Sequence, residues 1–326
     1  MGNLLPAPIT DKETQTGEGN GLVYGTSTMQ GWRKSMEDAH IASISPINFP
    51  SDVSFFAVCD GHGGKQVSAL AVEKLTHVMG QIMRKNKVFD TEGDLCPHAI
   101  GASMREAYLV LDTQIMEESN AQTCGSTSIS AIITSKHIIV ANVGDSRSVL
   151  GKDGKTVPMS FDHKPANAEE RNRIVKAGGT VRNNRVNGDL AVSRSLGDFV
   201  YKRCADLPPE EQQVSAEADI KIEPRDGTEE FLILACDGIW DVLSNDGICQ
   251  LVRDMLTQGE KDMGLIAEDI VDTCLKRRSR DNMSIVLIRL PGAKIGAGGG
   301  IAAIRRQQAL HGNTVDLTQL NSDSAA

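Results

Sequence analysis

The 326-residue sequence lacks any uninterrupted apolar run that approaches the roughly 20 residues needed by a membrane-spanning helix. Its first ten residues, MGNLLPAPIT, contain neither a basic segment nor a long apolar segment, so a secretory signal peptide is not indicated. From these two absences we expect a cytoplasmic or nuclear protein without a transmembrane segment.

Frameworks built on cysteine or on basic charge are also missing. The seven cysteines are scattered singly, without a Cys-x-x-Cys pair, which argues against a disulfide or zinc framework and favours reduced thiols. The 43 acidic residues outnumber the 34 basic residues, and the formal net charge is -9. Nucleic-acid backbones are bound by clustered lysine and arginine, so nucleic acid is not an expected partner.

Hydrophobic patterning is confined to the middle of the chain. Residues 1–20 contain Gly, Thr, Glu and Pro without a hydrophobic period, which predicts a flexible N-terminal lead-in. Residues 291–326 begin with PGAKIGAGGG and continue as mainly polar sequence, which predicts a flexible C-terminal tail. No fixed repeat or linker interrupts residues 21–290, so we expect one domain there.

Within this region the spacing of apolar residues predicts helices and strands. Apolar residues recur at three- and four-residue steps over 65–84, which is typical of an amphipathic helix. Further helices are expected over about 98–118 and after Asn167, Ser244 and Asp262. Strands are indicated at 54–59, 126–134, 137–142, 146–150, 231–236 and 283–290.

The three central strands follow one another within a few residues. Parallel neighbours need a crossover of a dozen residues or more, so these strands predict an antiparallel meander. Helix pairs flank the strands on both sides in the sequence. We therefore expect an α+β fold in which two packed, mainly antiparallel β-sheets are covered by helix pairs, an α-β-β-α sandwich.

Acidic residues stand where the predicted strands end or turn. FFAVCDGHGG and LILACDGIWD both carry an apolar run that stops at Cys-Asp-Gly. Asp-Gly is a favoured turn pair, so any one of these acids alone is more simply explained as a turn residue. Six acids at such positions instead indicate a shared site: Glu37, Asp38, Asp60, Asp145, Asp237 and Asp281.

Carboxylates that converge without neutralisation repel one another and have raised pKa values, so they need a cation among them. Oxygen ligands without a cysteine or histidine cluster favour Mg²⁺ or Mn²⁺ over zinc. Gly61 directly follows Asp60, and the absence of a Cβ lets its own carbonyl approach an ion closely. The sequence therefore predicts a magnesium or manganese site.

Eight stretches of the sequence occur in the order and approximate spacing of one enzyme family: RKSMEDAH, FFAVCDGHGG, CGSTS, VGDSRS, DHKP, RVNGDLAVSRSLGDF, LILACDGIWDV and SRDNMSIVL. They resemble the metal-dependent type 2C protein serine/threonine phosphatases over about residues 21–290. The resemblance implies a signalling hydrolase that acts on phosphoserine and phosphothreonine in phosphoprotein substrates, and we expect it to be a monomer.

The resemblance also implies roles for the acids. Two ions per active site are expected, with a weaker third. Asp60 resembles the carboxylate that bridges the two ions, and Gly61 resembles the residue that lends its carbonyl. The other matches are Asp237 and Asp281 for one ion, Glu37 for the second ion directly or through water with Asp38 close behind, and Asp145 and Asp241 for the third.

Two further residues match positions that act on the substrate. Arg33 resembles the side chain that binds the phosphate, a task suited to the planar fork of donors on guanidinium. His62 resembles the proposed general acid, which protonates the departing serine or threonine oxygen. The implied mechanism is direct attack on phosphorus by a hydroxide that bridges the two metals, without a phosphoenzyme. GST and RSLGDF are interpreted as structural.

Other functions stay open at this point. A metal-dependent nuclease or pyrophosphatase also clusters carboxylates around Mg²⁺, although the acidic balance disfavours the nuclease. A pseudophosphatase that acts as a binding module would carry substitutions at the metal positions, and none is seen. Gly2 could accept a myristoyl chain, but Pro6 stands where that motif has serine or threonine.

Overall fold

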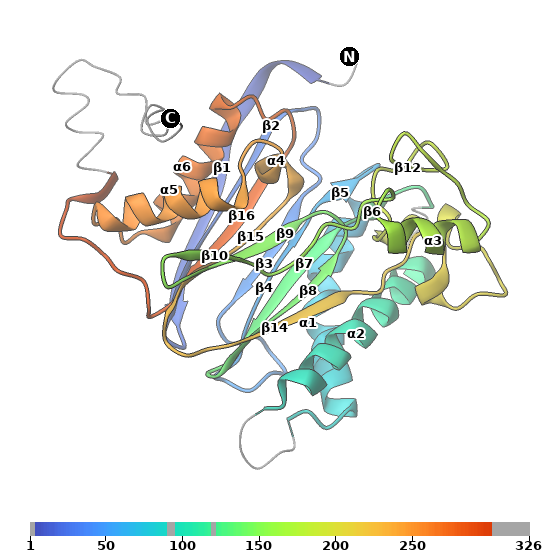
Figure 1. Ribbon diagram of the computed structural model, residues 1–326, viewed down its shortest axis with the longest axis horizontal. Helices are drawn as coiled ribbons and strands as arrows, with labels where there is room; N and C mark the ends of the chain where they lie inside the picture. The colour runs from blue at the N-terminus through green and yellow to red at the C-terminus, as the bar shows by residue number, and fades with distance from the viewer. Residues whose placement is uncertain (1–3, 90–94, 119–121, 302–326) are drawn as a thin grey trace.

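The computed structural model describes residues 4–89, 95–118 and 122–301. A five-stranded sheet and a six-stranded sheet pack face to face, and helices cover the outer face of each (Figure 1). The predicted α-β-β-α sandwich is confirmed.

Neighbouring strands are antiparallel in both sheets. In sheet order, the five-stranded sheet contains β14 (Asp219–Pro224), β8 (His137–Val143), β7 (Ser128–Ile133), β4 (Ser54–Cys59) and β3 (Ala39–Ser43). The six-stranded sheet contains β1 (Leu4–Gly19), β2 (Leu22–Arg33), β16 (Met283–Arg289), β15 (Glu229–Ala235), β9 (Arg147–Lys152) and β10 (Lys155–Pro158).

Smaller elements lie at one end of the sandwich. A three-stranded sheet has the order β13 (Leu196–Gly197), β6 (Gly125–Ser126) and β5 (Gly61–His62). The hairpin of β11 (Val181–Arg182) and β12 (Arg185–Val186) and the helix α3 (Ala168–Lys176) lie beside it (Figure 1). The short 3₁₀ turns are η1 (Phe199–Tyr201) and η2 (Pro209–Glu211).

Two helix pairs cover the sheets. One pair is α1 (Gln66–Lys85) and α2 (Pro97–Glu118), and the other is α5 (Asn245–Thr257) and α6 (Met263–Lys276), while α4 (Asp237–Trp240) is a single turn. Ser244 caps α5 by accepting from the N–H of Gly247, and Asp262 caps α6 by accepting from the N–H of Gly264. These caps are the sequence signals that predict both helices.

Strand β4 shows how its sequence divides between two cores. Phe56 and Val58 face the six-stranded sheet, while Phe55 and Ala57 face α1 and α2. All four are fully buried, because the strand has packed layers on both sides. This explains why the strand is an unbroken apolar run that ends at an acid.

The N-terminal prediction is wrong for Leu4–Gly19, which form β1 at the edge of the six-stranded sheet. Thr14 donates to Glu268 of α6 at 2.8 Å, and Lys12 pairs with Asp272 at 2.7 Å. An edge strand has one neighbour and a solvated face, so it needs no continuous apolar pattern. The predicted domain boundary at Gly21 therefore falls inside the sheet.

The predicted meander is only partly right. β7 and β8 pair, but the next strand, β9, pairs with β10 and β15 in the other sheet. The turn that contains Gly144, at φ +112°, therefore crosses from one sheet to the other instead of closing a hairpin. This crossing places Asp145 between the two sheets, at the end where β4 and β15 also stop.

The C-terminal prediction is also partly wrong. Ile301 is buried, and its N–H donates to Glu260 at 2.9 Å, so residues 291–301 pack beside α5 and α6. Residues 302–326, like residues 1–3 with Gly2, lie outside the described residues. None of the helices in the described ranges is long and apolar enough to cross a membrane.

Candidate active site

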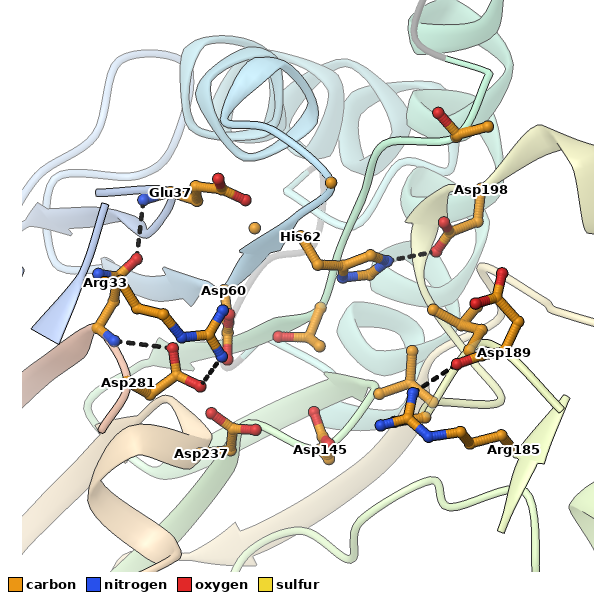
Figure 2. Close-up of a pocket in the computed structure, with 18 of the residues that line it drawn as sticks. Arg33, Glu37, Asp60, His62, Asp145, Arg185, Asp189, Asp198, Asp237 and Asp281 are labelled. Atoms are coloured by element: carbon orange, nitrogen blue, oxygen red, sulfur yellow. Dashed lines mark hydrogen bonds and ion pairs between the residues drawn. The ribbon is translucent and has the colours of Figure 1, made fainter. Parts of the chain in front are cut away.

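The two Cys-Asp-Gly segments end strands of different sheets. Asp60 follows β4 in the five-stranded sheet, and Asp237 follows β15 in the six-stranded sheet. Because the sheets are packed face to face, both acids reach one cavity of about 500 Å³. The predicted site residues that line it are Arg33, Glu37, Asp60, Gly61, His62, Asp145, Asp237 and Asp281 (Figure 2).

Asp38 and Asp60 are the two acids of the cluster that lie closest to each other and to Cys236. One ligand atom from each lies within 4.8 Å of the other and of the Cys236 thiol. Burial raises the pKa of Asp38 to about 6, and the hydrogen bond that Ser284 donates to it, at 2.7 Å, offsets only part of that effect. The pKa of Asp60 is raised well above its ordinary value by burial and then by the charges of Asp237 and Asp38.

Asp237 begins α4 and lines the cavity, and the more exposed Asp241 directly follows this helical turn. The pKa of Asp237 is raised well above its ordinary value by burial and by the charge of Asp145, and Lys164 opposes the shift. Burial likewise raises the pKa of Asp241, again against the effect of Lys164. Lys164 forms an ion pair with Asp145, which is itself almost fully buried.

The donor set fits a divalent cation. The second carboxylate oxygen of Asp38 is buried and has no hydrogen-bond partner in the described part of the structure. A buried carboxylate oxygen destabilises the fold unless a hydrogen-bond donor or a cation pairs with it. Hard carboxylate oxygens from several segments, each destabilised as an anion by its neighbours, are the donors that Mg²⁺ and Mn²⁺ accept.

Glu37 is oriented differently from its neighbour Asp38. Its carboxylate accepts hydrogen bonds from Ser35 at 2.6 Å and from the N–H of Gly64 at 3.0 Å. Figure 2 shows this carboxylate turned away from Asp60. The resemblance gave Glu37 as the main acid for the second ion, with Asp38 close behind. In the structure Asp38 is the one of the two that lies next to Asp60.

Arg33 ends β2 at the mouth of the cavity. Its guanidinium forms an ion pair with Asp281, and its side chain is 47% exposed (Figure 2). Asp281 also accepts a hydrogen bond from the N–H of Asn282 at 2.8 Å, which orients the carboxylate at the start of β16. The guanidinium is therefore held beside the carboxylates and remains accessible to an anion.

His62 lies on β5, two residues after Asp60, on the other side of the cavity. Its Nε2 lies 2.7 Å from a carboxylate oxygen of Asp198 (Figure 2). Burial by itself lowers the pKa of His62, but the hydrogen bond and the charge of Asp198 outweigh burial, so that the pKa is raised.

Known proteins are similar to this chain over most of its length. The family model "Protein phosphatase 2C" matches residues 22–283. Human protein phosphatase 1A is 42% identical over 298 residues, which cover 90% of this chain and 77% of the relative, and human protein phosphatase 1B is 43% identical over 88% and 61%. The chain belongs to the protein phosphatase 2C family.

Solved structures agree with this membership. A crystal structure of a phosphatase from Toxoplasma gondii matches this type 2C phosphatase with a TM-score of 0.74 and 25% sequence identity, over 87% of this chain and 97% of the other. The protein is accordingly a metal-dependent protein serine/threonine phosphatase, and its fold class, enzyme class and family are those predicted from the eight sequence stretches.

The structure of this type 2C phosphatase adds three residues that sequence reasoning missed. Lys164 of DHKP pairs with Asp145, and Asp198 of RSLGDF contacts His62. Asn282 accepts from the N–H of Glu37 at 3.0 Å and donates to the carbonyls of Gln30 and Ser35. All three residues lie inside the eight stretches, so the sequence marked them as candidates. Their contacts could not be predicted from their spacing along the chain.

Proposed function

We propose that this type 2C phosphatase hydrolyses phosphoserine and phosphothreonine in proteins by direct attack of water on phosphorus. The observation that carries the proposal is that Asp60 and Asp237 line one open cavity, with Asp38 directly beside Asp60 and the pKa raised at all three. Such a cluster is stable as anions only with cations bound, and bound cations are suited to phosphoryl transfer.

The cations are proposed to be two Mg²⁺ or Mn²⁺ ions and a weaker third. When bound, they activate water as a nucleophile and neutralise the phosphoryl oxygens. Asp60 would hold both principal ions, and Gly61 would contribute its carbonyl. The remaining donors are Asp237 and Asp281 for one ion, Asp38 and Glu37 through water for the second, and Asp145 and Asp241 for the third. The orientation of Glu37 towards Gly64 favours contact through water over direct ligation.

Arg33 is proposed to bind the phosphate of the substrate. Its five donors in a plane match phosphate oxygens, and its exposure of nearly half leaves it free to exchange Asp281 for a bound anion when cations neutralise Asp281. Because the same contact forms with substrate and transition state, Arg33 serves mainly binding.

His62 is proposed to be the general acid. As the P–O bond to the serine or threonine oxygen breaks, the imidazolium gives its proton to that oxygen and becomes neutral imidazole. The raised pKa of His62, which comes mainly from its contact with Asp198, favours the acid form. No phosphoenzyme is formed in this scheme, because water attacks directly.

The finer biological assignments are also proposals. We infer a monomer of the cytoplasm or nucleus that does not bind nucleic acid, consistent with its acidic balance. Acylation of Gly2 would add a weak membrane anchor. Intact mass after expression in a eukaryotic host tests acylation, and light scattering tests the monomer.

The experiment that tests the function compares substrates side by side. A phosphoserine peptide, inorganic pyrophosphate and single-stranded DNA are each incubated with the protein in excess chelator, in Mg²⁺ and in Mn²⁺. We expect release of phosphate from the peptide alone and only with metal. Full peptide turnover in chelator, or faster turnover of DNA or pyrophosphate, would overturn the proposal.

A further inference from the structure

A short three-stranded sheet brings His62 next to a residue far away in the sequence. In this sheet β6 lies between β5 and β13, with His62 opposite Gly125 and Gly197 opposite the same glycine. Asp198 directly follows β13. The two outer strands therefore place the imidazole of His62 and the carboxylate of Asp198 on either side of Gly125.

Gly125 has a steric reason to be glycine. A Cβ at this position would lie 2.1 Å from the carboxylate oxygen Oδ2 of Asp198 and 2.4 Å from Nε2 of His62. These are the two atoms that make the 2.7 Å contact. The contact thus passes directly over Gly125, and any side chain there would occupy the same space.

Asp198 is held in place before it reaches His62. Its side chain is 2% exposed, and Oδ2 accepts a hydrogen bond from the Ser195 hydroxyl at 2.6 Å. Its own N–H donates to the carbonyl of Cys124 at 2.8 Å, and its φ of +52° lies in the left-handed region that aspartate and asparagine tolerate best. The carboxylate cannot move away from His62 without breaking these contacts.

We propose that Asp198 is a positioning residue for the proton transfer by His62. The contact occupies Nε2, which donates to the carboxylate, so that Nδ1 is the nitrogen left to protonate the departing oxygen. In the step, the N–H bond at Nδ1 breaks as the O–H bond of the serine or threonine forms. The imidazole left behind keeps its proton at Nε2, bonded to Asp198, and Nδ1 takes a new proton from solvent.

This inference rests on the proposed role of His62, and leaving-group dependence separates the two. A general acid matters for a serine oxygen, which leaves as a strong base, and matters little for the phenolate of an activated aryl phosphate. The quantity to measure is the ratio of kcat for a phosphoserine peptide to kcat for p-nitrophenyl phosphate, at saturating Mn²⁺. H62Q should lower this ratio by roughly 10²–10⁴-fold.

D198N removes the carboxylate charge but keeps the shape and the tolerance for positive φ. We expect the ratio to fall roughly 10- to 100-fold, by analogy with the cost of removing the outer hydrogen-bond partner of a metal-bound histidine. The double variant D198N/H62Q should fall no further than H62Q alone, because both substitutions disable one proton transfer. Mn²⁺ affinity measured by calorimetry should be unchanged in D198N.

Asp112 of α2 supplies a matched control, because it contacts the same segment as Asp198. It accepts from the N–H of Gly197 at 2.7 Å and pairs with Lys202 at 2.7 Å, so it supports the backbone beside Asp198 without touching His62. D112N should leave the ratio of the two substrates unchanged. If D198N fails to fold, S195A removes one hydrogen bond to Asp198 and should lower the ratio by a smaller factor.

The outcomes distinguish the two assignments. If H62Q slows both substrates by the same factor, the general-acid role of His62 fails and the proposal fails with it. If H62Q lowers the ratio but D198N and S195A do not, or if D198N adds its full effect to that of H62Q, then His62 stands and the role of Asp198 is overturned.

Discussion

The molecule uses the tripeptide Cys-Asp-Gly twice, and the two copies lead to different structures. After Asp60 the chain continues as β5 and carries His62 to the far side of the cavity. After Cys236 the chain turns at once into α4, which ends next to Asp241. The same three residues therefore precede a strand that carries His62 and a helical turn that is followed by another carboxylate.

The charges around the two aspartates differ as well. Asp237, Asp38, Asp145 and Asp281 all raise the pKa of Asp60 beyond the effect of burial, whereas Lys164 opposes the rise at Asp237. The main charges that act on Asp60 are thus all negative, whereas those that act on Asp237 include the positive charge of Lys164. The same motif can therefore lie among negative charges alone or beside a positive charge that partly neutralises it, depending on which side chains the neighbouring segments place there.

The glycines of the two copies share a function that the sequence did not predict. A Cβ on Gly61 would lie 2.3 Å from the carbonyl oxygen of Glu37, and a Cβ on Gly238 would lie 1.9 Å from that of Asn282. In each case the absence of a side chain lets a neighbouring backbone approach the strand end. Gly61 is therefore required by packing, whether or not its own carbonyl binds an ion.

The largest expected effect separates Asp60 from a more peripheral acid. D60N should lower kcat by several orders of magnitude and weaken both principal ions, because it removes a shared charge. D145N should act mainly on the weakest ion. Turnover and Mn²⁺ calorimetry measure both effects, and small, equal losses in the two variants would contradict the ranking.

Without bound metal, the free energy of unfolding should fall as the pH rises from 4 to above 6. The pKa of Asp38 is raised from an ordinary 3.8 to about 6 in the folded protein. Between these two pH values the folded state therefore keeps a proton on Asp38 that the unfolded chain has lost. This stability is fully present below pH 4 and is lost as pH rises through 6, by on the order of 3 kcal/mol. Excess Mn²⁺ should remove the loss by pairing with the ionised carboxylates.

Thermal melting in chelator and in Mn²⁺ between pH 5 and 7.5 measures this effect. The variant D38N lacks the titrating group, so its stability in chelator should change less over the same range. A chelated wild-type protein that gains stability between pH 5 and 7, with D38N behaving identically, would show that Asp38 does not dominate the metal-free state.

A smaller effect on stability is expected from substituting Gly61 and Gly238, the glycines of the two Cys-Asp-Gly copies. G61A and G238A should each lower the free energy of unfolding by about 1–3 kcal/mol, since the added methyl meets backbone atoms. G238A should cost more, because its neighbour is closer. Urea unfolding of the metal-bound protein measures both.

Gly247 in the first turn of α5 serves as the control for these substitutions. The nearest atom to an added Cβ there is the Ser244 hydroxyl oxygen at 3.1 Å, and alanine favours the helix. G247A should therefore be close to neutral. If it destabilises as much as G238A, close backbone approach is not the reason for glycine in the Cys-Asp-Gly copies.

The smallest expected effect concerns Arg33, which pairs with Asp281 near the second copy. R33A should raise KM for a phosphopeptide about 10-fold with little change in kcat, because it removes a contact made equally in substrate and transition state. Steady-state kinetics at saturating Mn²⁺ measures the split. A large fall in kcat at constant KM would instead assign Arg33 to the transition state alone.

Local patterns in the sequence were sufficient for much of this structure. The apolar steps of α1, the caps of α5 and α6, and the unbroken apolar run of β4 each report burial by elements next to them, so their types and approximate bounds follow directly. The acids at strand ends could be found for the same reason, because a carboxylate after a buried strand is conspicuous. The order and spacing of the eight sequence stretches identified the family.

Tertiary structure alone decided what these segments meet. The pairing of β1 with β2 and the crossing of Asp145 between sheets depend on partners far away in the sequence, which no local period reports. The same holds for Asp198, which reaches His62 only because β6 pairs with a strand on each side. The sequence by itself determines which side chains are charged and which are apolar enough to be buried. The direction of the Glu37 side chain and the partner of His62 depend instead on backbone pairing between segments far apart in the sequence.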